Sequence, residues 1–309
     1  MSATPSIGII AVNYNSAAFI GEFLDSLDRI EYPDTKLIVV DSASRDGSLD
    51  EIERRRPDAV VVRCQENVGT AAGNNLGIQR CRELGLDYAL ILNNDTTHEP
   101  DFLQTLMDAA REQADEHTMV VPRILYSHDQ RLISTHAGDF DWTLGLFRNT
   151  YHAKPDCPAT RKRRLLQTAS FCCLLAPLSV FNEIGPLDER FFMYYEETDF
   201  IRKALDAGYR LLYAPEAVIY HQESGSSGGG WMNPFKQYYA SRNRLYLVRK
   251  HATSRLGYAF FTLYFWIGRL ASLPRYLVPK QRALVRAQLR GMLHYYRGQM
   301  GRTLEVKDF

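Results

Sequence analysis

Three consecutive polar residues, Asn93, Asn94 and Asp95, follow an apolar run at residues 88–92 that is typical of a buried strand. A carboxylate in this position can bind Mg²⁺ or Mn²⁺, which take oxygen ligands and keep positions open for phosphate oxygens. The two asparagine amides suit the hydroxyl groups of a ribose or a sugar, because they donate and accept hydrogen bonds without adding charge. The run alone is equally typical of a turn, so its surroundings must decide.

Polar residues also follow the other strands that the sequence predicts, at residues 7–12, 37–40 and 60–62. In an open α/β sheet, ligands bind outside the carboxyl ends of the strands. One such segment could be an ordinary turn, but turn preferences alone do not explain four polar segments at the same edge of the sheet. Together they predict a metal and diphosphate site there. The segments are Asn13-Tyr14-Asn15, Asp41-Ser42, Asn67-Val68-Gly69 and Asn93-Asn94-Asp95.

The elements that position these segments alternate between strand and helix patterns over the first third of the chain. Apolar residues at helical spacing form one stripe over residues 20–27, and residues 69–84 predict a further helix. Such alternation predicts an α/β fold with a mostly parallel sheet flanked by helices. Ser48 and Glu51 have the spacing of a capping box at a helix start.

The regular alternation fades after residue 121. A helix over residues 198–208 and a strand over residues 211–220, which leads to His221, are expected later in the chain. Residues 224–230 consist of glycine and serine, so we expect a flexible stretch there. It could close over a bound nucleotide as a lid.

The composition is that of a soluble globular protein, with 45% hydrophobic and 24% charged residues. A chain of 309 residues can form one large domain, or one domain with an appendage. Five cysteines without zinc or disulfide spacing indicate reduced thiols in a cytosolic protein, and we expect Cys172 and Cys173 to be buried. The N-terminus lacks the charged-then-apolar order of a secretion signal.

The charge is divided unevenly, although the whole chain carries a net charge of +1. Residues 231–309 hold 15 Lys or Arg residues against two acidic residues, whereas residues 1–230 hold 22 basic and 34 acidic residues. This division predicts one main domain over residues 1–230, in which the pattern of elements changes from about residue 122. It also predicts a basic helical extension over residues 231–309 that meets an anionic surface.

Residues 258–273 of the extension are rich in aromatic residues, contain Arg269 and end before Pro274. A helix that spans a bilayer needs about 20 apolar residues, so this stretch is more typical of an aromatic, basic helix in the membrane interface. Packing on the main domain and a homodimer contact are the alternatives. We expect no nucleic acid as partner, because the aromatic residues cluster instead of alternating with basic ones.

Over residues from about 6 to 250, the chain resembles family-2 glycosyltransferases with the GT-A fold, and among these the bacterial rhamnosyltransferase-like branch. The order and the intervals of several motifs carry the resemblance. It implies that residues 1–230 form a nucleotide-sugar-binding and catalytic domain, with acceptor-side elements from about residue 122. It also implies a nucleotide-diphosphate sugar donor and a divalent cation, Mg²⁺ or Mn²⁺. The motifs are Val12-Asn13-Tyr14-Asn15, the run from Asp41 to Ser48, Asn67-Val68-Gly69, the run from Gly73 to Gly77, Asn93-Asn94-Asp95, the run from Gly185 to Phe192, the run from Tyr195 to Asp199, and His221.

The resemblance assigns donor-binding roles to residues at the predicted sheet edge. Asp95 stands where the family binds the cation, and His221 stands where a histidine commonly completes the metal site, although a lone histidine is otherwise more often structural. Asn93 replaces the family's usual aspartate, so we assign it with Asn94 to hydroxyl groups of the ribose or sugar. Asp41 is expected to bind the pyrimidine base. The other expected nucleotide-sugar-binding residues are Asn13, Asn15, Asn67, Gly69 and Asn75.

The catalytic base is expected in the acidic group at the start of a late helix. Inverting transfer needs a carboxylate that accepts the proton of the acceptor hydroxyl. The family's acidic pair corresponds to Glu196 and Glu197, so Glu197 is the preferred base and Asp199 is its rival. One of these three acids is expected only to complement the helix N-terminus. Arg242 or Arg244, on a following amphipathic helix, either contacts a diphosphate or lies in solvent.

These expectations predict an inverting glycosyltransferase that moves a hexosyl unit, with dTDP-L-rhamnose as a candidate donor. The acceptor is expected to be a saccharide or a polyprenyl-diphosphate-linked saccharide, in cell-wall or surface-polysaccharide synthesis. Such an enzyme would be cytoplasmic and peripheral on the inner face of the cell membrane. One alternative is a sugar nucleotidyltransferase, whose glycine-rich basic phosphate loop residues 7–16 do not provide. The other is a non-catalytic nucleotide-sugar-binding scaffold, which would not need both the metal motif and the acidic pair.

Overall fold

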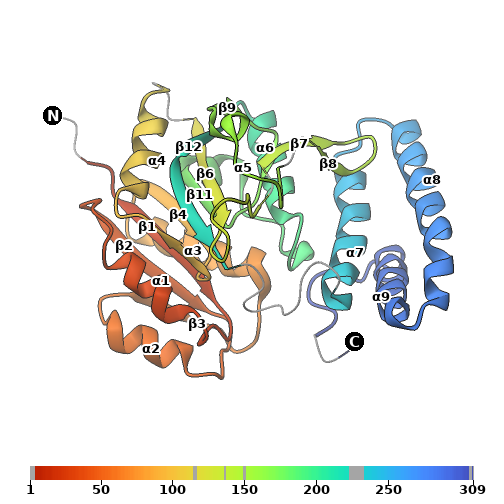
Figure 1. Ribbon diagram of the computed structural model, residues 1–309, viewed down its shortest axis with the longest axis horizontal. Coiled ribbons are helices and arrows are strands. Elements are labelled where there is room, and N and C mark those ends of the chain that lie inside the picture. Colours follow the sequence, from red (N-terminus) through yellow and green to blue (C-terminus); the bar gives the residue numbers. More distant parts are fainter. Residues whose placement is uncertain are drawn as a thin grey trace.

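The computed structural model shows a central β-sheet with helices on both faces and further helices from the C-terminal part at one side (Figure 1). The predicted lid over residues 224–230 lies outside the part of the chain that is described. The structure describes residues 4–113, 117–135, 137–148, 151–222 and 233–305, together with Asp308.

The first part of the chain alternates between strands and helices, as the sequence predicts. Its central strands are near-continuous apolar runs, as expected of strands covered on both faces. The elements are β1 (Ile7–Asn13), α1 (Ile20–Leu27), β2 (Thr35–Asp41), α2 (Ser48–Arg55), β3 (Val60–Arg63), α3 (Gly69–Glu83), β4 (Tyr88–Leu92), β5 (Thr96–His98), α4 (Phe102–Arg111) and β6 (Thr118–Tyr126).

The second part combines short strands with longer helices toward the C-terminal end. The late strand that the sequence predicts is present and delivers His221, and Cys172 and Cys173 are buried as expected. The elements are β7 (Ala137–Asp141), β8 (Leu146–Arg148), β9 (Arg164–Leu165), β10 (Thr168–Ala169), β11 (Cys173–Pro177), α5 (Leu178–Ile184), α6 (Glu196–Asp206), β12 (Arg210–His221), α7 (Pro234–Lys250), α8 (Arg255–Ser272) and α9 (Pro279–Tyr296).

Within the described residues, nine strands form one sheet in the order β3-β2-β1-β4-β11-β6-β12-β5, and β9 pairs with β12. Strands β3, β2, β1 and β4 run parallel, and so do β6 and β12. Strands β11, β5 and β9 run antiparallel to their neighbours. The predicted α/β fold with a mostly parallel sheet is confirmed. Strands β10, β7 and β8 form a second, small sheet.

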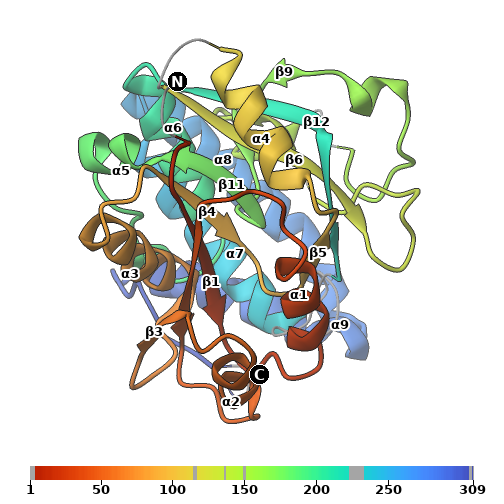
Figure 2. The ribbon, with the colours of Figure 1, turned by 90° about the vertical axis from the view of Figure 1, so that its left-hand side faces the viewer.

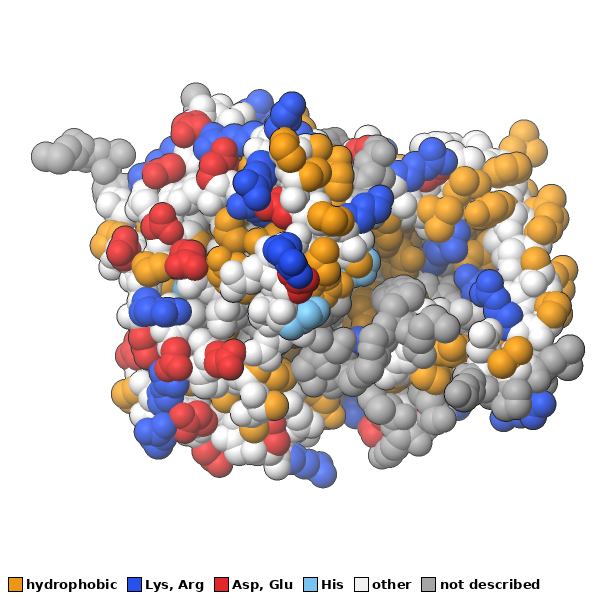
Figure 3. Space-filling model, viewed as in Figure 1, with side chains coloured by type: hydrophobic (Ala, Val, Ile, Leu, Met, Phe, Trp, Pro, Cys, Tyr) orange, Lys and Arg blue, Asp and Glu red, His pale blue; other side chains and the backbone are white. Residues whose placement is uncertain are grey.

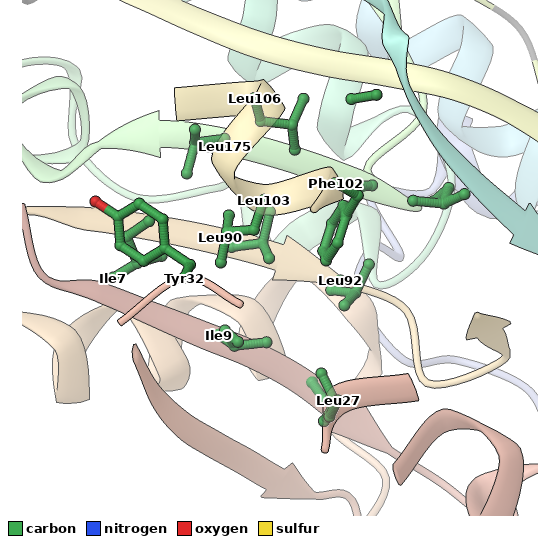
Figure 4. Packing of buried hydrophobic residues seen from close by; sticks show 14 of the residues in the cluster. Ile7, Ile9, Leu27, Tyr32, Leu90, Leu92, Phe102, Leu103, Leu106 and Leu175 are labelled. Atoms are coloured by element: carbon green, nitrogen blue, oxygen red, sulfur yellow. The ribbon is translucent and has the colours of Figure 1, made fainter. Parts of the chain in front are cut away.

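Successive residues of the central strands face two different cores, because side chains alternate along a strand. Ile9, Leu90 and Leu103 belong to the core between the sheet and helices α1, α2 and α4 (Figure 4). Ile10 and Phe200 belong to the core on the other face, which α3, α5 and α6 cover. Figure 2 shows helices on both sides of the sheet. Burial on both faces fixes the strands and therefore the positions of their ends.

Ser48 does not form the capping box that its spacing with Glu51 predicts. Helix α2 begins at Ser48 itself, after Gly47 with a φ of 82°, and no side chain caps it. The Ser48 hydroxyl donates to Asp46 Oδ1 at 2.6 Å and lies 3.0 Å from Asn13 Nδ2. The prediction is wrong because this hydroxyl bonds the ends of other elements, which competes with helix capping.

The C-terminal helices pack on the main domain through α7. Phe235 and Tyr239 of α7 share a buried cluster with Phe192, and α7 also packs along α9. Helix α8 lies outermost, and hydrophobic side chains gather over it at the right edge of the space-filling view (Figure 3). No helix in the described part of the chain is both long and apolar enough to cross a membrane.

Candidate active site

Asn13 connects the ends of three parallel strands. It lies opposite Asp41 in the register of β1 and β2. Asn13 Nδ2 lies 2.8 Å from Asp41 Oδ1, and Asn13 Oδ1 accepts from Asn94 Nδ2 at 2.8 Å. Both Asn13 and Asp41 are buried. The Asn13 amide therefore bonds protein groups and holds the residues that follow β2 and β4 at one edge of the sheet.

Asn15 fixes the loop that follows β2. Its Oδ1 accepts from the backbone N–H of Arg45 at 2.9 Å, and its own backbone N–H donates to Ser44 Oγ at 3.1 Å. The φ of Asn15 is 50°, in the left-handed region that Asn adopts more readily than most residues. The structure thus places Asn15 between the loops that follow β1 and β2.

Asn67 and Gly69 shape the loop that leads into α3. Asn67 Oδ1 accepts from the Gly69 backbone N–H at 2.9 Å, and the φ of Gly69 is 79°. A Cβ atom at Gly69 would lie 2.4 Å from the carbonyl oxygen of Phe192, so a larger residue does not fit. Asn75 faces another loop, because its amide donates to the Leu187 carbonyl at 3.0 Å and accepts from the Leu187 backbone N–H at 2.9 Å.

A cavity of about 170 Å³ opens at this edge of the sheet. Residues from the loops after the parallel strands line one side, and residues from the C-terminal part line another. Asn13, Asp41 and Asn75 lie behind the lining. The lining residues are Val12, Tyr14, Ser42, Asn67, Gly69, Thr70, Asn74, Leu92, Asn93, Asn94, Asp95, Phe192, Met193, Phe235, Arg302, Leu304 and Glu305.

Asp95 and His221 meet at this site, although 126 residues of the sequence separate them. His221 Nε2 lies 3.2 Å from Asp95 Oδ1, and His221 Nδ1 lies 3.0 Å from Ser134 Oγ. Asp95 Oδ1 is buried, and the His221 imidazole is paired with it without well-aligned hydrogen-bond geometry. A carboxylate oxygen and an imidazole nitrogen that converge in this way could hold Mg²⁺ or Mn²⁺, with phosphate and water oxygens as the other ligands. The described residues contain no group of three or more side chains that could hold a metal ion by themselves.

Glu196 and Glu197 begin α6 next to the cavity. Glu196 is buried and accepts a hydrogen bond from the hydroxyl of Thr70, which lines the cavity. Burial raises the pKa of Glu196. Burial and then the neighbouring charge of Glu196 raise the pKa of Glu197 well above its ordinary value. The pair therefore holds a proton to higher pH than a carboxyl group in water.

Asp199 is in a different environment from the glutamates. Its side chain is fully buried, and its carboxylate forms ion pairs with Lys250 Nζ at 2.8 Å and His251 Nε2 at 2.8 Å. Lys250 also pairs with Asp188 at 2.7 Å. Asp199 thus connects the first turn of α6 to the end of α7, and it does not line the cavity.

The loop before Glu196 has an unusual backbone. Phe192, Tyr194 and Tyr195 have φ values of 67°, 65° and 74°, in a region that side chains rarely adopt. Such a conformation persists only where the surroundings hold it. The Phe192 carbonyl accepts from the Thr70 backbone N–H at 2.9 Å, which ties this loop to the start of α3.

Arg242 and Asn243 of α7 hold the same loop from the other side. The Asn243 amide donates to the Phe191, Met193 and Tyr194 carbonyls at 2.9, 2.7 and 3.0 Å. The fully buried Arg242 guanidinium donates to the Phe191 carbonyl at 2.9 Å. The structure thus places Arg242, for which a diphosphate contact was one prediction, behind the cavity and not in its lining.

Several lining residues were not found by the sequence reasoning. Thr70 and Asn74 lie in the predicted helix after Asn67, and their helical position could have indicated them. Arg302, Leu304 and Glu305 follow the last helix, and nothing in the local sequence distinguishes Arg302 from the other basic residues of the extension. The last three depend on a return of the chain that only the structure shows.

The fold is that of GT-A glycosyltransferases, with a cavity at the carboxyl ends of the parallel strands. The sequence profile of Glycosyl transferase family 2 matches residues 8–174. The chain belongs to this family, which confirms the resemblance seen in the sequence.

Two relatives of the chain are glycosyltransferases according to their names. The chain is 26% identical to the N-acetylglucosaminyl-diphospho-decaprenol L-rhamnosyltransferase of Mycobacterium tuberculosis (strain ATCC 25618 / H37Rv), over 73% of this chain and 78% of the relative. It is 28% identical to the low-salt glycan biosynthesis hexosyltransferase Agl10 of Haloferax volcanii, over 64% of this chain and 61% of the relative.

Solved structures share the fold at low sequence identity. The mannosyltransferase PcManGT from Pyrobaculum calidifontis, in complex with GDP-Man and Mn²⁺, has a TM-score of 0.53 at 16% identity, with 99% of this chain and 79% of that chain covered. GalNAc-T7, with UDP, GalNAc and Mn²⁺, has a TM-score of 0.62 at 14% identity, with 96% of this chain and 57% of that chain covered.

Proposed function

We propose that this enzyme is a metal-dependent, inverting hexosyltransferase that acts on a polyprenyl-diphosphate-linked saccharide. The observation that supports this proposal is the cavity at the strand ends, with Asp95 and His221 together and the Glu196–Glu197 pair beyond Thr70. One site thus combines a candidate cation site for a diphosphate with carboxyl groups for proton transfer.

In this proposal Asp95 and His221 would hold the cation. The cation would supply positive charge to the leaving diphosphate. The ligand set fits because a buried carboxylate oxygen of Asp95, which lines the cavity, converges with an imidazole nitrogen of His221. Asn93 and Asn94 line the cavity and bind hydroxyl groups of the donor. Ser42 lines the side of the cavity proposed for the base, and Asp41, held by Asn13 and the Ser44 backbone N–H, lies next to it outside the lining.

Glu197 is the general base in this proposal. Its carboxylate accepts the proton of the acceptor hydroxyl as that oxygen bonds to the anomeric carbon, and the bond from that carbon to the diphosphate breaks on the opposite side, which inverts the configuration. Glu197 is preferred over Asp199 because Lys250 and His251 already bind the Asp199 carboxylate. Asp199, with Arg242, then positions the loop and helix that carry the acidic pair.

L-Rhamnose is the proposed donor sugar, as dTDP-L-rhamnose. A relative at 26% identity is named as an L-rhamnosyltransferase whose acceptor is a lipid-linked N-acetylglucosamine. One wall of the cavity consists of Phe192, Met193, Phe235 and Leu304, which suits the methyl group of a 6-deoxy sugar better than a hydroxyl. The acceptor would enter from the side of the elements after about residue 122.

The lipid-linked acceptor requires access to a membrane, and α8 is the proposed contact. Leu256, Leu263 and Ile267 of this helix are 84%, 61% and 56% exposed, and the C-terminal extension is strongly basic. A helix of this kind can lie in the interface of an anionic membrane without crossing it. We therefore propose a peripheral enzyme on the inner face of the cell membrane. A homodimer through α8 is the competing proposal.

A transfer assay with purified enzyme tests the function. Donors are dTDP-L-rhamnose, UDP-N-acetylglucosamine and GDP-mannose with Mn²⁺, and the acceptor is a short-chain polyprenyl-diphosphate N-acetylglucosamine. We expect transfer from dTDP-L-rhamnose with inversion, and its loss on chelation of the metal or in Asp95→Asn. Formation of a nucleotide-sugar from a nucleoside triphosphate and a sugar phosphate would instead identify a nucleotidyltransferase. Donor binding without any turnover would identify a scaffold.

A further inference from the structure

The chain turns back toward the cavity after α9, over residues 299–305, which we call the return segment (Figure 1). The turn uses Gly298 and Gly301, whose φ values are 69° and 73°. The Gly301 backbone N–H donates to the Arg190 carbonyl at 2.7 Å. The end of the helical extension thus reaches the loop that precedes the acidic pair.

Buried side chains of α7 fix the return segment. Arg242 donates to the Gly301 carbonyl at 2.7 Å, and the Tyr239 hydroxyl donates to the Leu304 carbonyl at 2.9 Å. The Tyr238 hydroxyl lies 2.6 Å from Thr303 Oγ1. Because Arg242, Tyr238 and Tyr239 are fully buried, the path of the return segment is part of the folded core.

This path brings Arg302 to the cavity, where it is the only Lys or Arg among the lining residues of the described chain. Its guanidinium pairs with Glu66 at 2.7 Å and with Glu305 at 2.6 Å, and its side chain is 29% exposed. Both carboxylates are largely exposed, so these pairs contribute little to the position of Arg302, which the path of the return segment determines. A guanidinium has five N–H donors in a fixed fork, so it can bind a phosphate group in a bidentate manner.

We propose that Arg302 binds the diphosphate of the nucleotide-sugar donor. This inference rests on the proposed function and adds a binding residue that lies outside the family's matched region, which ends at residue 174. When the bond to the anomeric carbon breaks, the diphosphate gains a negative charge that one divalent cation, already shared with the Asp95 carboxylate, does not neutralise. A further cation in the cavity therefore stabilises the bound donor and, more strongly, the leaving group. On binding, phosphate oxygens replace Glu305 at the guanidinium.

Calorimetric titration with nucleotides tests this proposal on the full-length enzyme. The titrants are dTDP, UDP and GDP with Mn²⁺, and the matching nucleosides. For the diphosphate that the wild type binds, we expect Arg302→Gln to raise the Kd by about 10- to 100-fold, since hydrogen bonds to charged groups are strong. Nucleoside binding should stay unchanged, and Arg302→Lys should lie between the two because it keeps the charge without the fork.

Glu66→Gln is the matched control. It breaks the ion pair between Glu66 and Arg302 but leaves Arg302 in place, and Glu66 does not line the cavity. It should keep the wild-type affinity for the diphosphate. Equal losses of affinity in Glu66→Gln and Arg302→Gln, or wild-type affinity in Arg302→Gln, would overturn the role of Arg302. A wild-type enzyme that binds none of the three diphosphates would overturn the proposed function, and this inference with it.

Discussion

At the scale of single residues, the proposed proton transfer depends on how the two adjacent glutamates are buried. The buried Glu196 accepts a hydrogen bond from the Thr70 hydroxyl, whereas Glu197 is the partly exposed member of the pair. Because burial and the charge of Glu196 raise the pKa of Glu197, its carboxylate is a stronger base than a glutamate in water. The same shift means that a larger fraction of Glu197 is protonated, and thus inactive, at low pH.

The first prediction concerns the pH dependence of transfer. A general base acts only when deprotonated, so kcat should rise with pH through a value well above the ordinary carboxyl pKa of 4.5. Glu197→Gln should lower kcat by about 10²- to 10⁴-fold and remove this limb of the profile. Asp199→Asn serves as the comparison, because its carboxylate is bound by Lys250 and His251. If Asp199→Asn removes the limb and Glu197→Gln keeps it, Asp199 is the base.

The second prediction concerns stability. A carboxyl group whose pKa is raised on folding contributes stability at low pH, and this contribution is lost as pH rises from the unfolded pKa toward the folded one. The glutamine in Glu197→Gln does not ionise, so this variant lacks the partly buried negative charge that destabilises the wild type at neutral pH. Its Tm should therefore exceed that of the wild type at neutral pH, and the difference should shrink toward pH values below the ordinary carboxyl pKa. Thermal unfolding over a pH series measures this, and a pH-independent difference would contradict the raised pKa.

The residues of the site differ in how far the sequence could predict them. Asp95 and His221 were placed together by the resemblance, and the structure brings their side chains to 3.2 Å. Arg302 could not be predicted, because a basic residue in a basic extension carries no local signal. Arg242 illustrates the opposite case, since its position on α7 is correct but its guanidinium bonds backbone carbonyls instead of the cavity. The direction of a side chain depends on tertiary packing, and the spacing of residues in the sequence does not predict this packing.

At the scale of elements, the acidic pair depends on a loop that could not hold its shape alone. Left-handed backbone at Phe192, Tyr194 and Tyr195 costs on the order of 1–3 kcal/mol for each residue. Thr70 at the start of α3 and Asn243 in α7 bind its carbonyls from two sides. The sequence predicted the strands well because apolar runs decide burial, but this loop is determined by contacts between distant segments.

The third prediction tests this arrangement with Asn243→Ala. The change removes the amide that donates to three carbonyls, of which only that of Phe191 also accepts from Arg242, and should lower the free energy of unfolding by about 1–3 kcal/mol. Because a displaced loop moves Glu197, kcat should fall by about 10- to 100-fold in protein that is still folded. Arg249→Ala, an exposed change on the same helix, is the control and should alter neither quantity strongly. Loss of stability with an unchanged kcat would show that the loop does not position the base.

At the scale of the whole molecule, the C-terminal helices have two different sides. Tyr238, Tyr239 and Arg242 of α7 face the return segment and the cavity wall, whereas α8 carries exposed apolar residues on the outer side (Figure 3). The sequence predicted a basic, aromatic extension but not that its last residues line the cavity. One helical unit therefore joins the proposed membrane contact to the proposed diphosphate-binding residue.

The fourth prediction separates membrane binding from dimer formation. Leu263→Gln combined with Ile267→Gln should weaken sedimentation with phosphatidylglycerol vesicles by at least about 10-fold, since each large apolar side chain contributes about 1.5–3 kcal/mol when fully buried. Wild-type binding should also fall with added salt, because basic residues are attracted to the anionic surface. Leu84→Gln, an exposed change at the end of α3, is the control and should bind as the wild type does.

Donor binding in solution should persist in the wild type, in the double variant and in Leu84→Gln. The competing proposal predicts that the wild type does not bind vesicles and self-associates as its concentration rises, whereas the double variant stays monomeric. In that case α8 is a dimer contact, and the enzyme must reach the lipid-linked acceptor in another way.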